Sequence, residues 1–195
     1  MGDPTIPGRA RRRLRRPVPE RCFRYTPARM SAAETTCPGC GLQMPRGQAT
    51  YDGSFHASPE CWSVFTEVIG AEFGNAPLFG LVHQLTVDAY AVQHAGGPHP
   101  DKSVDVHLTG LHLVLERGLR PVDVPLRLQR LVAATHAWPH FDPPVARGKL
   151  TVADIALAGP AGHAETVRRW AAETWQRWNA HHAAVAEMAC KTFGD

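Results

Sequence analysis

The chain has 195 residues, enough for one sizeable domain or for one domain that carries a small metal-binding module. Its five cysteines, an odd number, argue against a disulfide scaffold and for a reducing compartment. No apolar run approaches the ~20 residues of a membrane span, and the basic N-terminus lacks the apolar core of a secretory signal, so we expect a cytoplasmic protein.

The net charge of +3 is unevenly distributed along the chain. Residues 1–30 hold nine Lys and Arg residues against two Asp and Glu residues, whereas the remaining residues hold twelve against sixteen and are mildly acidic. We therefore predict that residues 1–34 form a disordered basic tail. Two other interpretations stay open: the tail could hold the phosphates of a nucleic acid, or Met30 could be the true first residue.

The stretch Cys37-Pro38-Gly39-Cys40-Gly41 is typical of a zinc knuckle. Its glycines let the backbone curl until two sulfurs can reach about 2.3 Å from one ion. Further on, Asp52-Gly53 lies between the short apolar and polar runs 49–51 and 54–56, which predicts a β-hairpin. Knuckle and hairpin together indicate a small metal module.

The stretch Ser58-Pro59-Glu60-Cys61 predicts a helix over residues 59–73. Ser58 suits the N-cap, Pro59 suits the first helical position, and the helix dipole favours a thiolate at Cys61 in the first turn. A knuckle, a hairpin and a ligand at a helix start resemble a treble-clef zinc finger. We assign this module to residues 35–74, with Zn as its cofactor.

Three cysteines need a fourth ligand to complete a zinc site. His56, at the end of the second predicted hairpin strand, is the nearest candidate and would give a structural Cys3His site with Cys37, Cys40 and Cys61. A treble clef usually takes two ligands from its helix start, whereas this chain offers one there. Cys22 or a histidine of the body therefore remain as substitutes for His56. The competing interpretation is a reduced Cys pair without metal, which leaves Cys61 unexplained.

The remainder, residues 75–195, is predicted to be a helical bundle, so that the fold class is mostly α with the small zinc module packed on it. Apolar residues at steps of three and four predict helices, which caps, glycines and prolines delimit. The expected helices span 75–95, 103–117, a segment from about Pro125 to before Pro139 with Asp123 as its cap, a short helix from Thr151 to Gly159, and a long helix from Pro160 to about Lys191.

Polar side chains on these apolar faces suggest a second site in the bundle. Tyr90 and His94 are one turn apart, and an antiparallel neighbour would bring His107 opposite them. We therefore name Tyr90, His94 and His107 as candidates for a catalytic or ligand-binding site, with His181 or His182 as a further donor. Buried imidazoles and a phenol suit a metal or an acid–base pair. The alternative is that each is a core residue held by one hydrogen bond.

Several motifs resemble an uncharacterised bacterial family that is catalogued as a domain of unknown function. The similarity covers about residues 37–188, and the segment from His83 to His94 is its most distinctive part. The resemblance implies no activity. The motifs are Cys37-Pro-Gly-Cys40-Gly, Ser58-Pro-Glu-Cys61-Trp62, His83-Gln-Leu-Thr-Val-Asp88-Ala-Tyr90-Ala-Val-Gln93-His94, Leu115-Glu116-Arg-Gly118, Leu150-Thr-Val-Ala-Asp154 and the stretch from Trp170 to His182.

Three functions fit these patterns. The first, which we favour, is a zinc-binding protein whose bundle holds a second metal or a small molecule and could be a metalloenzyme of unknown reaction. The second is a zinc-finger module that binds nucleic acid or protein without catalysis; the acidic body disfavours nucleic acid except through the Arg-rich tail. The third is a regulator in which every histidine is structural. Whether the protein is an enzyme, and its oligomeric state, stay open, because no known catalytic motif occurs in the sequence.

Overall fold

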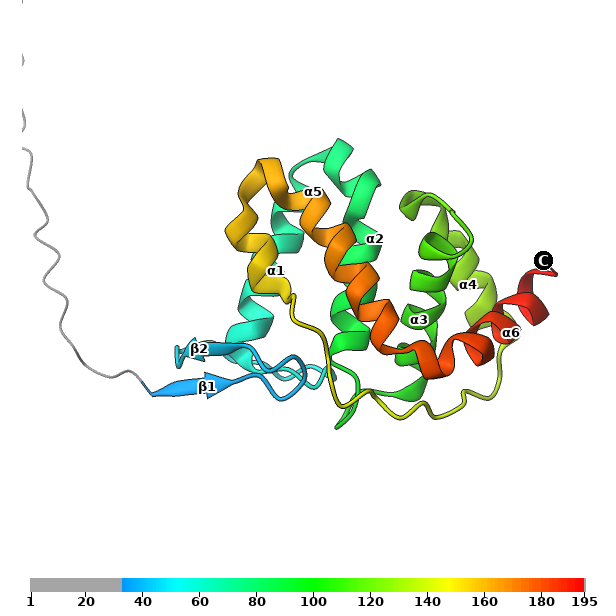
Figure 1. The fold of residues 1–195 in the computed structure, drawn as a ribbon, viewed down its shortest axis with the longest axis horizontal. Coiled ribbons are helices and arrows are strands. Elements are labelled where there is room, and N and C mark those ends of the chain that lie inside the picture. The colour runs from blue at the N-terminus through cyan, green and yellow to red at the C-terminus, as the bar shows by residue number, and fades with distance from the viewer. Residues whose placement is uncertain (1–32, 195) are drawn as a thin grey trace, which may run out of the picture. The chain divides into compact units, whose positions relative to one another are not determined.

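The computed structural model describes residues 33–194, which belong to one compact unit. Within this range six α-helices accompany one antiparallel two-stranded sheet (Figure 1). This confirms the predicted fold class, a mostly α-helical protein with a small cysteine-bearing module beside the bundle. The predicted tail, apart from its last two residues, and Cys22 lie outside the described residues.

The sheet pairs β1 (Glu34–Thr36) with β2 (Gln43–Pro45), so that the two strands enclose the knuckle. Cys37 N donates to Leu42 O at 2.8 Å, and Gly41 adopts a φ of 77°, which a residue with a side chain rarely adopts. The hairpin that Asp52-Gly53 predicted is not formed, since residues 46–57, all of them described, contain no strand.

The segment around Asp52-Gly53 folds onto its neighbours instead. Phe55 N donates to the Tyr51 hydroxyl at 2.7 Å, and His56 N donates to His94 O at 3.0 Å. These bonds use backbone groups that a hairpin ladder would need, and they tie the segment to the end of the bundle.

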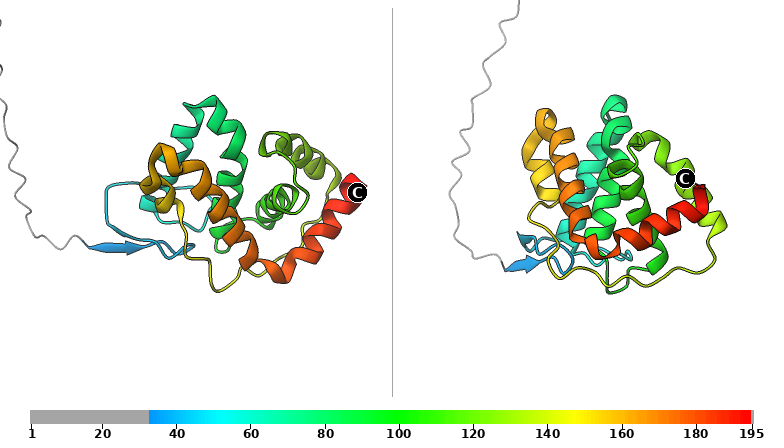
Figure 2. Two further views of the ribbon diagram at one scale, coloured as in Figure 1. Left: turned by 45° about the horizontal axis from the view of Figure 1, so that its top comes forward. Right: turned by 45° about the vertical axis from the view of Figure 1, so that its right-hand side comes forward.

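Helix α1 (Pro59–Phe73) begins as the sequence predicts. The Ser58 side chain accepts a hydrogen bond from Cys61 N at 3.2 Å, and Pro59 occupies the first turn. Helix α2 (Ala76–Gln93) follows after a short turn, and the Asn75 side chain caps it by accepting from Leu78 N. Helix α2 contacts α1, α3 and α5 and forms the centre of the bundle (Figures 1 and 2).

Helix α3 (Asp101–Leu115) and helix α4 (Val124–Ala134) lie close to the predicted ranges. A 3₁₀ turn at Pro121–Asp123 precedes α4. Asp123 does not cap α4 with its side chain, because its carboxylate instead pairs with Arg120 at 2.7 Å.

The long C-terminal helix is broken twice. In α5 (Val152–Arg177) Gly159 has a non-helical backbone with φ 62°, and Pro160 then starts the second half, as the sequence predicts. The predicted continuation to Lys191 is wrong, since a 3₁₀ turn at Asn179–His181 separates α5 from α6 (His182–Phe193). Side-chain bonds accompany this turn: His181 Nε2 contacts Asp142 O at 3.1 Å and His182 Nε2 contacts Trp175 O at 2.9 Å.

The helical bundle has a closely packed interior. Trp170, Trp175 and Trp178 of α5 and the following residue are among the largest fully buried side chains. Between residues 33 and 194, no helix combines the length and the apolar character that crossing a membrane requires.

Candidate metal centre

Four donor side chains converge where α1 begins and α2 ends. They are Cys37 and Cys40 of the knuckle, Cys61 of the first turn of α1, and His94 at the C-cap of α2. Their ligand atoms all lie within 4.8 Å of one another. The Cys40 and Cys61 sulfurs are 3.7 Å apart, and Cys61 Sγ lies 3.4 Å from His94 Nε2. These separations match the edges of a tetrahedron with metal–ligand bonds of about 2.0–2.3 Å.

The knuckle is shaped to let the imidazole approach. A Cβ atom added at Gly39 would lie only 2.5 Å from Cδ2 of His94 and 3.0 Å from its Cα. A side chain at position 39 would therefore displace the imidazole from the sulfurs. Glycine here serves close packing against a residue far along the chain.

The orientation of His94 leaves one ring nitrogen for a metal. Its Nδ1 lies 2.7 Å from the Tyr90 carbonyl oxygen, which can only accept, so Nδ1 carries the proton. The lone pair is then on Nε2, the atom that faces Cys61. A backbone carbonyl that fixes the tautomer in this way is the usual partner of a metal-binding histidine.

Further contacts hold the sulfurs and seal the site. Ser58 N donates to Cys37 Sγ at 3.4 Å, and the Tyr90 hydroxyl donates to Cys61 Sγ at 3.8 Å. The Tyr90 ring is stacked between His94 and Phe65, with ring centroids 4.0 Å and 3.9 Å away. The four candidate ligands are at most 9% exposed, so that water has little access to them.

Crowding of the three sulfurs shifts their pKa values in opposite directions. Hydrogen bonds from Cys40 and Cys61 lower the pKa of the Cys37 thiol. The same hydrogen bonding to Cys37, together with burial, raises the pKa of Cys40 to about 12 and raises the pKa of Cys61 as well. Three thiolates cannot coexist in this space unless a cation neutralises them, which is what a divalent metal does.

The fourth donor differs from the residue that the sequence favoured. His94 lies with the sulfurs, whereas His56 contributes its backbone N–H to His94 O and packs its ring against Gly97. The Nδ1 atom of His56 is buried without a hydrogen-bond partner among residues 33–194. A histidine of the body is among the substitutes that the sequence allows, and Gly39 together with the C-terminal position of His94 is the signal that could select it.

The predicted grouping of Tyr90, His94 and His107 is formed only in part. Tyr90 and His94 stack on each other beside Cys61. His107 instead bonds through Nδ1 to the fully buried Asp88 carboxylate at 2.7 Å. His107 therefore has its own partner in Asp88 and is not among the side chains that converge with the three sulfurs.

Sequence reasoning missed a second polar cluster, centred on Glu72 of α1. This carboxylate is fully buried and receives hydrogen bonds from His83 Nδ1 at 2.7 Å, His163 Nε2 at 2.9 Å and the Thr86 hydroxyl at 2.6 Å. Its position could have been found, because Glu72 lies eleven residues after Cys61 on the same buried stripe of α1. Charged residues are rarely fully buried unless they are paired.

The comparisons with known proteins give a family but no activity. The family model described as "Family of unknown function (DUF5946)" matches residues 35–179, which include all four candidate ligands and both halves of α5. No curated protein matches the chain. No solved structure matches it either.

Proposed function

This chain belongs to the DUF5946 family of unknown function. We propose that it is a zinc protein in which one structural ion binds ligands from the knuckle and from the helical bundle and so holds the two together. The proposed ligands are Cys37, Cys40, Cys61 and His94. The observation that carries the proposal is their convergence from three separate segments within 4.8 Å, with the proton of His94 already placed on the far nitrogen.

The donor set favours zinc. Three thiolates and one imidazole suit a borderline-soft divalent ion that prefers tetrahedral geometry. The same chemistry implies a reducing compartment, and we assign the protein to the cytoplasm. The knuckle between two strands and the ligand in the first helical turn support a treble-clef-like module over residues 35–74, with the bundle over 75–195.

The site is better suited to structure than to catalysis. A catalytic zinc keeps an open position for water or substrate, whereas this site has four protein donors that are nearly inaccessible. Structural zinc contributes directly to folding free energy, since the ligands converge only in the folded chain. Here the ion would join residues 37–61 to the C-terminal end of α2.

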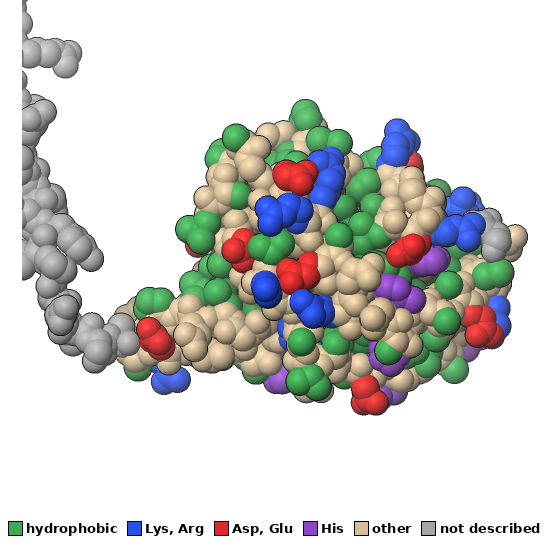
Figure 3. Space-filling model, viewed as in Figure 1, with side chains coloured by type: hydrophobic (Ala, Val, Ile, Leu, Met, Phe, Trp, Pro, Cys, Tyr) green, Lys and Arg blue, Asp and Glu red, His purple; other side chains and the backbone are tan. Residues whose placement is uncertain are grey.

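Charge argues against a nucleic-acid module built on the folded body. After residue 30 the chain holds twelve Lys and Arg against sixteen Asp and Glu residues. On the face in Figure 3, basic and acidic side chains are interspersed. A surface that tracks phosphates concentrates positive charge.

Metal analysis of purified protein tests the proposal. Wild-type protein should hold one zinc per chain, and His94→Ala should lose most of it because three thiolates alone bind less tightly. His56→Ala is the matched control and should keep its zinc. If His56→Ala lost the metal and His94→Ala retained it, the assigned fourth ligand would be wrong. A wild-type protein without affinity for zinc would refute the proposed zinc site as a whole.

A further inference from the structure

A cavity of about 330 Å³ lies between α1, α2 and α5. Its volume is near the lower end of the ~300–1,000 Å³ range of small-molecule sites. Apolar side chains such as Val68, Leu78 and Ile155 line it, and the ring of His163 forms part of its wall. The break of α5 at Gly159 and Pro160 also borders the cavity, so that residues on both sides of the break face one space.

The polar wall of this cavity is backed by a buried carboxylate. His163 Nε2 lies 2.9 Å from Oε1 of Glu72, which is fully buried. Burial alone would raise the pKa of Glu72, but hydrogen bonds from His83, Thr86 and His163 outweigh burial and lower it. Glu72 is therefore an ionised acceptor at neutral pH, and the three donors hold it in place.

This acceptor determines what His163 offers to the cavity. Because an ionised carboxylate only accepts hydrogen bonds, Nε2 of His163 carries a proton. In the neutral ring the second nitrogen, Nδ1, then has a free lone pair. Nδ1 has no hydrogen-bond partner among the residues that the structure describes. Apart from His163, the only polar side chains in the lining are Glu67 and Asn75, which are both exposed, and the remaining walls are apolar. The bond to Glu72 fixes the orientation of the His163 ring.

We propose that this cavity binds a small apolar molecule carrying one hydrogen-bond donor, such as a phenolic or alcoholic hydroxyl, which donates to Nδ1 of His163. The site is separate from the zinc ligands and does not depend on them for its contacts. It gives the bundle a small-molecule function of its own.

Charge around the cavity disfavours an anionic ligand. Glu67 lines the cavity and is exposed, and the lining contains no Lys or Arg residue. A carboxylate ligand would meet a like charge there and an acceptor nitrogen inside. A neutral donor meets neither obstacle.

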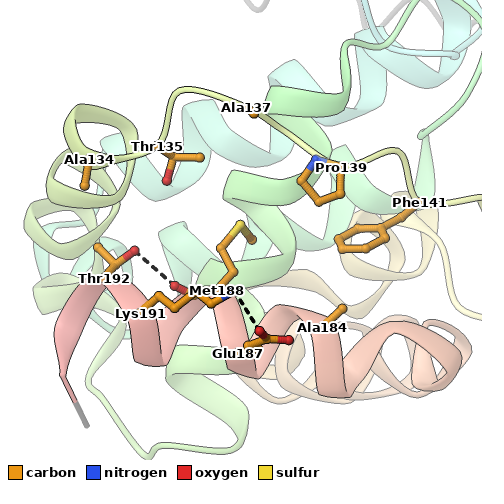
Figure 4. A pocket seen from close by; sticks show the side chains of 10 residues that line it. All are labelled: Ala134, Thr135, Ala137, Pro139, Phe141, Ala184, Glu187, Met188, Lys191 and Thr192. Carbon is orange, nitrogen blue, oxygen red and sulfur yellow. Dashed lines mark hydrogen bonds and ion pairs between the residues drawn. The ribbon is translucent and has the colours of Figure 1, made fainter.

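A second cavity of about 420 Å³ lies between the end of α4, the following loop and α6 (Figure 4). Three of its polar side chains are already engaged: Lys191 bonds to Glu187 at 2.7 Å and the Thr192 hydroxyl donates to Met188 O at 3.0 Å. It therefore offers less to a polar ligand than the cavity at His163.

Binding of three matched probes tests the proposal by ¹⁹F NMR titration of the zinc-loaded chain. The probes are 4-fluorophenol, fluorobenzene, which lacks a polar group, and 4-fluorobenzoate, an anion. 4-Fluorophenol should bind about fivefold more tightly than fluorobenzene, the factor that one hydrogen bond of ~1 kcal/mol provides, and 4-fluorobenzoate should bind more weakly still. Equal binding of phenol and fluorobenzene, tighter binding of the benzoate, or absence of binding would each overturn the proposal.

Three variants locate the site. His163→Leu should abolish the preference for the phenol, and Ala156→Leu, at an exposed wall position, should weaken both neutral probes at least ~10-fold by filling the cavity. Ala161→Leu is the matched control, an exposed alanine of the same helix outside the lining, and should bind as wild type does. An unchanged preference in His163→Leu would refute the assigned acceptor.

If His163→Leu does not fold, the proposal can be tested on the His163 ring of the wild-type protein. The ¹⁵N signal of His163 Nδ1 should be that of an unprotonated nitrogen and should shift when 4-fluorophenol is added. A purely structural histidine would show no shift, and that result would refute the proposal. Zinc content, measured on each sample, distinguishes a failure of the small-molecule proposal from a failure of the proposed zinc site.

Discussion

Replacing Gly110 with alanine should destabilise the protein, although alanine is the better helix former. Gly110 is buried in α3, where a Cβ atom would lie 2.7 Å from Cγ and 2.9 Å from Oδ1 of Asp88. Asp88 is fully buried and cannot swing into solvent. His107 Nδ1 at 2.7 Å and Gln84 Nε2 at 2.8 Å hold Oδ1 of its carboxylate in place.

The size of the effect follows from three contributions. Overpacking of a filled core costs about 1–3 kcal/mol. Moving Asp88 away weakens at least one hydrogen bond to a charged group, which contributes roughly 1.5–3 kcal/mol. The higher helix propensity of alanine offsets these losses by up to about 1 kcal/mol. We therefore expect Gly110→Ala to lower the free energy of unfolding by about 3 kcal/mol.

Urea denaturation of the purified protein measures this change. Gly70→Ala is the matched control, since Gly70 is also helical and has open space where its Cβ would lie, and it should be neutral or stabilising by up to about 1 kcal/mol. The double variant Asp88→Ala, Gly110→Ala should be less destabilised than the sum of the two single changes by about 2 kcal/mol, because the clash has gone. Additive effects, or a Gly110→Ala protein as stable as wild type, would refute the reasoning.

Two further changes test buried polar groups. Gln93→Leu should lower the free energy of unfolding, measured by urea denaturation, by about 3 kcal/mol, because it leaves the Trp170 N–H and two loop carbonyls without partners. The control Gln129→Leu, at an exposed site, should change the free energy of unfolding by no more than about 0.5 kcal/mol. Equal effects of the two substitutions would contradict this role of Gln93. Burial and, secondarily, the Asp101 charge raise the pKa of the fully buried Asp105 from 3.8 to about 7. Between these values the folded chain keeps the proton that the unfolded chain has lost, so the free energy of unfolding falls as pH rises. Asp105→Asn should therefore stabilise the protein by about 2–3 kcal/mol more at pH 8 than at pH 5, again in urea denaturation, whereas a pH-independent effect would contradict the raised pKa.

Local signals in the sequence predicted the elements whose ends are determined locally. The capping residues Ser58 and Asn75 begin α1 and α2 as expected. Gly159 and Pro160 divide α5 at the expected place. In each case the backbone preference of one or two residues is sufficient, so no knowledge of distant contacts is needed.

Features that depend on distant contacts could not be predicted in this way. The Asp52-Gly53 segment has the right residues for a hairpin, but a bond within the segment and one from His56 N to His94 O at the end of α2 form instead. The sequence favours His56, close to Cys61, as the fourth candidate donor, whereas His94, which lies with the sulfurs, follows Cys61 by 33 residues. The continuous α5–α6 seam likewise had suitable periodicity but breaks where His181 and His182 bond elsewhere. Periodicity alone does not reveal such partners.

The distinctive segment from His83 to His94 acquires a physical meaning from its pairing with α1. Three cross-helix pairs recur in one antiparallel register: Cys61 with His94, Phe65 with Tyr90, and Glu72 with His83. Cys61 and Glu72 are eleven residues apart, as are His83 and His94, which corresponds to about 16 Å along each helix.

This register explains why polar residues occupy an otherwise apolar helix face. A slip of α1 against α2 by one turn would separate all three pairs at once, leaving the Glu72 carboxylate buried without His83 and the sulfurs without His94. Burying an unpaired charge costs far more than an apolar mismatch, so the polar pairs at the two ends penalise every alternative packing of the same apolar stripes. The candidate metal centre and the Glu72 cluster thus both contribute to the alignment of α1 with α2, each at a different end of the paired helices.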